Sequence, residues 1–145
     1  MKILVAVDGS QASLCAVRHA LQLLREGLRA DILLAAIQEP TYVYEMVLPP
    51  SADVLERLGG AVGARALADA ESLLAQAGVA CTREIGSGEP APALVDIAER
   101  HGCAQIVMGA RGLGPMRGAL LGSVSQSVLQ KAKVPVTIVK DDTAA

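Results

Sequence analysis

The sequence predicts an α/β fold built on a doubly wound, five-stranded parallel sheet with helices on both faces. Short apolar runs alternate with longer segments of helical periodicity along all 145 residues, which is the pattern of such sheets. The first run, residues 2–8, is almost continuously apolar, as expected for a strand that is buried on both faces. Hydrophobic residues make up 52% of the chain but Phe and Trp are absent, so Leu, Val, Ile and Ala must form the core. This length fits a single domain covering residues 1–145.

The alternation predicts where each element lies. Strands are expected at residues 2–8, 31–37, 80–85, 104–108 and 134–139, and helices at residues 11–26, 52–77, 91–100 and 123–131. In the last helix, the spacing of Val124, Val128 and Leu129 directs these side chains toward the sheet. Pro135 lies in the last expected strand, and because proline cannot donate to a ladder, that strand belongs at an edge of the sheet.

Charge and hydropathy argue against several classes of partner. The net charge is −2, with 13 basic and 15 acidic residues spread along the chain, so no electrostatic footprint for nucleic acid is visible. No apolar run approaches the roughly 18 residues needed to span a bilayer, and the first apolar run is interrupted by Asp8, which is not typical of a signal peptide. We therefore expect a cytoplasmic protein with no nucleic-acid or membrane partner.

Cysteine and histidine give little indication of catalysis. Cys15, Cys81 and Cys103 are odd in number and widely spaced, so we expect small buried hydrophobic side chains rather than a disulfide framework or a zinc site. His19 is expected on the solvated face of its helix, and His101 at a helix C-terminus, where a cation is favoured. Neither histidine has a neighbour in the sequence that would orient it as a general base.

The stretch from Gly109 to Ser123 carries the clearest functional pattern. It holds five glycines in fifteen residues and joins an expected strand to an expected helix. Glycine permits positive φ and close approach of backbone N–H groups to an anion, and a helix start carries a partial positive charge, so the pattern predicts a phosphate site. The P-loop signature with its lysine is absent. A relaxed dinucleotide-like spacing is present, but no acidic residue follows where a ribose partner is expected.

The glycine spacing is G-x2-G-x9-G-S, with Gly109, Gly112, Gly122 and Ser123 at the fixed positions. This spacing resembles the nucleotide-binding motif of the universal stress protein family, in its ATP-binding branch. The opening residues 3–10 and the closing residues 134–139 resemble the same family. The resemblance implies the strand order 3-2-1-4-5, a Rossmann-like arrangement similar to that of the adenine nucleotide alpha hydrolases.

In that order Asp8 and Gly109 end neighbouring strands and face one crevice, at the point where the winding reverses. The ligand-binding residues that the resemblance implies are Asp8, Ala36, Met108, Gly109, Arg111, Gly112, Gly122, Ser123, Val124 and Ser125. Backbone N–H groups near Gly112 and from Gly122 to Val124 would hold the triphosphate, and the two serine hydroxyls would add donors. Asp8 would accept from ribose or adenine, or help to hold Mg or Mn through the phosphates, although it could equally cap the turn that follows it.

Three of these residues carry more specific expectations. Ala36 and Met108 would line the adenine pocket, and Arg111 would stand near the phosphates. Ala110 occupies a position that is often Ser or Thr in the family, so one hydroxyl contact is missing here. The connection 38–52, with Tyr42 and Tyr44, could fold over a ligand or pack on the next helix.

The function expected from these observations is ATP binding by a nucleotide-responsive regulator of the stress response. Two alternatives remain, a slow ATPase or nucleotidyl transferase of the same fold, and a flavin or electron-transfer module. The segment Val134–Val139 is more apolar than an exposed edge strand usually is, and its flanking charged residues are Lys133 and Lys140. We therefore expect a homodimer through this strand.

Overall fold

The computed structural model describes residues 1–38, 52–112 and 121–141, with the backbone alone for residues 52–62. Its elements follow the expected order with small shifts of their ends. They are β1 (Lys2–Ala6), α1 (Gln11–Arg25), β2 (Asp31–Gln38), α3 (Ala52–Gln76), β3 (Cys81–Ser87), α4 (Pro90–Arg100), β4 (Gln105–Gly109), α5 (Ser123–Lys131) and β5 (Val136–Val139). The connection that carries Tyr42, Tyr44 and Met46 lies outside the described residues.

The strands form one parallel sheet in the order β3-β2-β1-β4-β5, which confirms the expected arrangement. β1 lies at the centre, where Leu4 is in register with Leu33 of β2 and with Ile106 of β4. The chain winds from β1 toward β3 in its first half and from β4 toward β5 in its second. The reversal therefore lies between β1 and β4, where a ligand site is expected in a doubly wound sheet.

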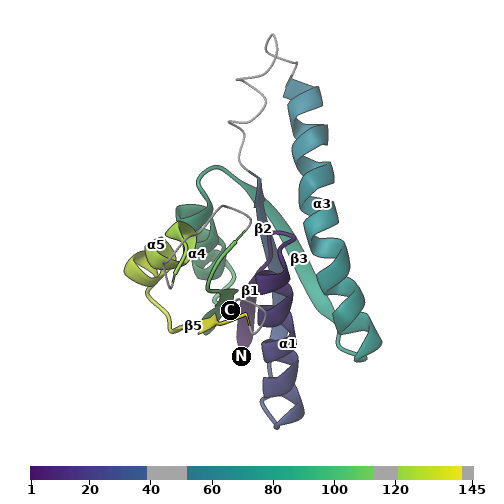
Figure 1. The fold of residues 1–145 in the computed structure, drawn as a ribbon, viewed down its shortest axis with the longest axis vertical. Coiled ribbons are helices and arrows are strands. Elements are labelled where there is room, and N and C mark those ends of the chain that lie inside the picture. Colours follow the sequence, from purple (N-terminus) through teal and green to yellow (C-terminus); the bar gives the residue numbers. More distant parts are fainter. Residues whose placement is uncertain (39–51, 113–120, 142–145) are drawn as a thin grey trace.

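Two helices cover each face of the sheet (Figure 1). α1 and α3 pack on one face, over a core that includes Ile3, Val5 and Leu34 of the strands. α4 and α5 pack on the other face, over a core that includes Leu4 and Ile106. Because successive residues of a strand point to opposite faces, a continuous apolar run such as β1 supplies both cores. Within the described residues, no helix is both long and apolar enough to cross a membrane.

The last two elements differ in detail from expectation. Leu129 was expected to face the sheet, but its side chain is 42% exposed while the preceding Val128 is fully buried. β5 begins at Val136 rather than Val134, and Pro135 precedes it with a carbonyl that accepts a hydrogen bond from Ile106 N at 3.0 Å. The edge position of β5 is confirmed.

The expectation of three buried cysteines holds for Cys103 alone. Its side chain is 4% exposed, whereas Cys15 and Cys81 are half-buried. Burial raises the pKa of the Cys103 thiol. Burial also raises the pKa of the Cys81 thiol, and the negative charge of Glu71 adds to that effect. Thiols with a raised pKa are poor nucleophiles, because the thiolate is the reactive form.

The histidine at the end of α4 has a partner that the sequence did not reveal. His101 is the C-cap of α4, as expected from its place beside the helix end, and its Nε2 lies 2.7 Å from Oε1 of Glu84 on β3. Arg100 donates from Nη2 to the other oxygen of Glu84 at 2.6 Å and from Nε to Asp96 at 2.8 Å. The Glu84 carboxylate thus ties the edge strand β3 to the end of α4.

We expect Glu84→Gln to lower the free energy of unfolding by about 1 kcal/mol at neutral pH, because it removes the partly exposed ion pair with Arg100 and the carboxylate that contacts His101. The hydrogen bonds from His101 and Arg100 hold the pKa of the Glu84 carboxyl below its ordinary value of 4.5. A group with a depressed folded pKa stabilises the protein above its unfolded pKa, and this contribution disappears as the pH falls through the folded pKa. The difference between wild type and variant should therefore vanish in acid below pH 4.5.

Urea unfolding at a series of pH values measures this difference. Glu71→Gln is the matched control, because the ion pair that Glu71 forms among the described residues is the exposed one with Arg83 at 3.2 Å. A Glu84→Gln difference that stayed constant from neutral pH into acid would contradict the prediction.

Candidate functional site

The turn after β1 is fixed by its own side chains. Asp8 Oδ1 accepts from the Ser10 N–H at 2.9 Å, and Ser10 Oγ caps α1 by accepting from the Ser13 N–H at 3.1 Å. Gly9 between them has a φ of +87°, a conformation that other residues rarely adopt. Asp8 therefore serves as the cap of its turn, which is one of the two roles expected for it. Its side chain is nevertheless exposed, and its second oxygen points to another loop.

That other loop follows β4. A Cβ placed on Gly112 would lie 2.6 Å from Asp8 Oδ2, so the two loops are in contact at the carboxyl edge of the sheet. This is the juxtaposition that the strand order implied for Asp8 and the glycine-rich stretch. Any side chain at position 112 would displace the Asp8 carboxylate.

Gly109 is required by packing within the protein. A Cβ on Gly109 would lie 2.8 Å from the carbonyl oxygen of Ala12, in the first turn of α1. The expectation that this glycine serves a ligand thus has a competing explanation, the close approach of β4 to the start of α1. Its backbone still ends β4, the strand that lies beside β1 at the reversal point.

We expect Gly109→Ala to lower the free energy of unfolding by about 1–3 kcal/mol, the usual cost of overpacking a rigid backbone contact. Chemical denaturation of purified protein measures it. Gly122→Ala is the control, because a Cβ at Gly122 would meet only ordinary contacts and the change should cost clearly less. Equal losses in the two variants would contradict the packing explanation for Gly109.

The start of α5 is joined to the end of β4 by one carbonyl group. The Ala110 carbonyl accepts from the Gly122 N–H at 2.7 Å and from Ser125 Oγ at 2.9 Å. Ser125 is 2% exposed, and its hydroxyl also lies 3.1 Å from the Gly122 carbonyl. The Gly122 N–H and the Ser125 hydroxyl, which were expected to bind the triphosphate, are both hydrogen-bonded to the Ala110 carbonyl in this structure. Sequence reasoning missed this role of Ala110, because a backbone carbonyl leaves no signal in a side-chain pattern.

The donors left at this end of α5 are the N–H groups of its first turn. The first bond of the helix runs from the Gln126 N–H to the Gly122 carbonyl at 3.0 Å, and no side chain caps the helix among the described residues. Ser123 is exposed and Val124 is half-buried, so their N–H groups lie at the surface end of the helix. Uncapped N–H groups of this kind carry the positive end of the helix dipole.

Glycine at position 122 is explained neither by its backbone conformation nor by contacts among the described residues. Its φ is −74°, which any residue can adopt. A Cβ there would lie 3.4 Å from the Ala110 carbonyl oxygen and 3.6 Å from the Arg111 Cα, which are ordinary contacts. Nothing in the described part of the chain therefore requires glycine at this position, although Gly122 is buried.

Positive φ was one of the reasons given for glycine in this stretch, and for the described members it is wrong. None of Gly109, Gly112 and Gly122 has a positive φ, and Gly114 and Gly118 lie outside the described residues. The positive φ angles occur at Gly9, Gly27, Gly78, Gly88 and Gly102. What the structure shows at Gly109 and Gly112 is close contact with other parts of the protein, Ala12 and Asp8.

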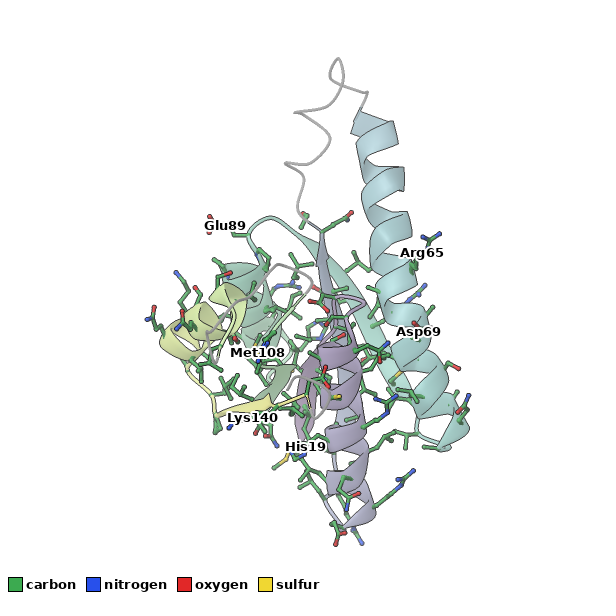
Figure 2. All side chains as sticks on the ribbon, viewed as in Figure 1. His19, Arg65, Asp69, Glu89, Met108 and Lys140 are labelled. Carbon is green, nitrogen blue, oxygen red and sulfur yellow. The ribbon has the colours of Figure 1, made fainter. Side chains whose placement is uncertain are left out.

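Ala36 and Met108 do not form one pocket with their side chains. Ala36 is 2% exposed and packs in the core under α1 and α3, whereas Met108 is 5% exposed and packs in the core under α4 and α5. Figure 2 shows Met108 on the α4 and α5 side of the sheet. If these two positions contact adenine, they would do so through their backbone groups. Arg111, beside the joined loops, is half-exposed.

The described residues offer no ready-made metal site. Among them, no three His, Cys, Asp or Glu side chains gather closely enough to hold an ion. A divalent ion at this site would therefore need ligands from a bound molecule, with Asp8 as the carboxylate that lies at the joined loops.

The geometry defines a class of protein, a doubly wound α/β domain whose glycine-rich stretch lies at the reversal point of its sheet. The sequence model of the universal stress protein family matches residues 1–140, and the chain belongs to that family. The universal stress protein YxiE of Bacillus subtilis is 30% identical to this chain, and the match covers 96% of this chain and 98% of YxiE.

Solved structures agree with the fold. The structure of hypothetical protein MJ0577 superposes with a TM-score of 0.80 at 24% identity, covering 99% of this chain and 97% of that one. A universal stress protein crystallised in complex with cAMP superposes with a TM-score of 0.70 at 30% identity, covering 96% of each chain.

Proposed function

We propose that this protein binds ATP together with Mg²⁺ or Mn²⁺ at the joined loops and acts in the cytoplasm as a nucleotide-responsive regulator of the stress response. The observation that carries the proposal is a glycine at position 122 that the described residues do not require. A position with an ordinary φ and ordinary contacts holds glycine beside uncapped N–H groups. A phosphate at a helix start explains both features.

The family relationship supports an adenine nucleotide as the ligand. One structural relative at 30% identity was crystallised with cAMP, which shares adenine, ribose and phosphate with ATP. The spacing G-x2-G-x9-G-S favours a triphosphate, because it resembles the motif of the ATP-binding branch. The proposal assigns the phosphates to the N–H groups of Ser123 and Val124, to the Ser123 hydroxyl and to Arg111.

Asp8 would act on the other side of the nucleotide. Its Oδ1 is bound to the Ser10 N–H, so Oδ2, which lies beside Gly112, is the oxygen offered to ribose or to a divalent ion. A carboxylate and phosphate oxygens are the ligands that Mg²⁺ prefers in nucleotide sites. The regulatory part of the proposal follows from the family, and it is supported by the place of His101, which Glu84 contacts at the C-terminal end of α4 and not at the joined loops. The proposal also includes a homodimer through β5.

Isothermal calorimetry with Mg-ATP, Mg-GTP and cAMP tests the proposal. We expect saturable heat with Mg-ATP, a weaker response to Mg-GTP, and a loss of affinity in Asp8→Ala. Asp69→Ala is the matched control and should bind as wild type does, because Asp69 is exposed on the outer side of α3, away from the sheet (Figure 2). Wild-type protein that gave no heat with any of the three at millimolar concentration would overturn nucleotide binding. Tighter binding of cAMP than of Mg-ATP would overturn the triphosphate assignment alone.

A further inference from the structure

One buried hydroxyl joins the two ends of the glycine-rich stretch. Ser125 is 2% exposed, and its Oγ lies 2.9 Å from the carbonyl oxygen of Ala110, 15 residues away in the sequence. The Gly122 carbonyl oxygen is the other acceptor within reach, at 3.1 Å. The hydroxyl has one proton to donate, and the shorter contact is the one to Ala110. The same carbonyl accepts from the Gly122 N–H at 2.7 Å, so each of its two lone pairs has a donor. The chain that leaves β4 at Ala110 and returns at Gly122 is therefore closed by two hydrogen bonds to a single oxygen.

The position of this oxygen matters for an anion. It lies beside the start of α5, next to the N–H groups that would hold phosphate, and a carbonyl oxygen carries partial negative charge. Because both lone pairs of the Ala110 carbonyl oxygen already accept hydrogen bonds, this oxygen does not accept from the Ser123 and Val124 N–H groups. The two bonds also hold it in an orientation that does not point at a phosphate bound there. With one donor removed, the carbonyl would have a free lone pair beside those N–H groups.

We propose that Ser125 is a positioning residue for phosphate, which acts through the Ala110 carbonyl and does not touch the nucleotide. Its hydroxyl holds that carbonyl against the start of α5, and so fixes the separation between the ends of the glycine-rich stretch and keeps the first-turn N–H groups free. This inference rests on the proposed function, since it concerns the phosphates of the same ligand.

The test compares Ser125→Ala with Ser127→Ala by calorimetry, using Mg-ATP and adenosine. Ser127 is the matched control because it lies on the same helix and is half-buried. Loss of one hydrogen bond that positions the phosphate donors should weaken Mg-ATP binding by about 3- to 10-fold in Ser125→Ala. The affinity of Ser125→Ala for adenosine should stay within about 2-fold of the wild-type value, since adenosine has no phosphate, and a 2-fold change is the smallest effect expected from losing one hydrogen bond. Ser127→Ala should bind both ligands as wild type does, and Ser125→Thr, which keeps the hydroxyl, should restore Mg-ATP binding.

A second readout needs no nucleotide. The Arg111 amide nitrogen shares a planar peptide group with the Ala110 carbonyl, so its NMR resonance senses the hydrogen bonds that the carbonyl accepts. In nucleotide-free protein, Ser125→Ala should shift the Arg111 and Gly122 amide resonances and speed hydrogen exchange at Gly122, whereas Ser127→Ala should leave both unchanged.

Three outcomes would overturn the inference: unchanged Mg-ATP affinity in Ser125→Ala, equal losses for Mg-ATP and adenosine, or unchanged Arg111 and Gly122 resonances. Failure of the proposed function is a separate result. In that case wild-type protein would bind neither ligand, while the resonance shifts of the nucleotide-free variant would still show whether Ser125 holds the Ala110 carbonyl.

Discussion

A Gly122→Val variant is expected to fold like the wild type and to lose affinity for Mg-ATP by about 100-fold or more, equivalent to ~2.7 kcal/mol. The backbone allows the change, because φ at Gly122 is −74° and a Cβ there meets only ordinary contacts among the described residues. The two methyl groups of valine would fill the room beside the first-turn N–H groups of α5. A phosphate could then no longer reach those donors at hydrogen-bond distance.

The substitution should lower the free energy of unfolding by only about 1 kcal/mol, because glycine is a better N-cap than an aliphatic residue. Circular dichroism and urea unfolding establish that it folds, and calorimetry with Mg-ATP measures the loss of binding. Gln126→Val places the same side chain in the same helix at an exposed position, and it should bind as wild type does. A folded Gly122→Val protein with wild-type affinity would show that the phosphates are held elsewhere.

The sequence could predict the elements and, through the family resemblance, their order in the sheet. Alternation of apolar runs and helical segments places every strand within a few residues of its observed position. The order β3-β2-β1-β4-β5 is not contained in that alternation, because the pattern does not specify which strands are neighbours. The resemblance supplied the order, and the site followed from it, since β1 and β4 had to be adjacent for Asp8 and Gly112 to meet.

What the sequence could not supply are features that depend on contacts between elements. Gly109 is required by a carbonyl of α1, and no local pattern distinguishes a glycine needed for space from one needed for positive φ. The side chains of Ala36 and Met108 lie on opposite faces of the sheet. The sequence does not indicate this, because strands buried on both faces show no alternation of apolar and polar residues. The contact of His101 with Glu84 joins residues 17 positions apart, on two elements whose packing is known only from the fold.

The protein is expected to form a homodimer through β5, and one substitution on its open edge should dissociate it. The Ile106 N–H donates to the Pro135 carbonyl at 3.0 Å and the Ala110 N–H to the Val139 carbonyl at 2.9 Å. Backbone groups alternate in direction along an extended strand, so the N–H and C=O groups of Val136 and Ile138 point away from β4. Since β5 ends the described sheet, these groups are available to a second copy, which a two-fold axis would place antiparallel.

Ile138→Pro removes an outward N–H and leaves the bonds to β4 in place, so it should convert the dimer to a monomer. The Ile138 side chain packs against the core under α4 and α5, and its loss alone would weaken the fold. Ile138→Ala is the control for that loss, because it keeps the N–H and should remain dimeric. Light scattering should give about twice the chain mass of 14.9 kDa for wild type and for Ile138→Ala, and the chain mass for Ile138→Pro. A monomeric wild type at micromolar concentration would refute the dimer, and a dimeric Ile138→Pro variant would move its interface to another surface.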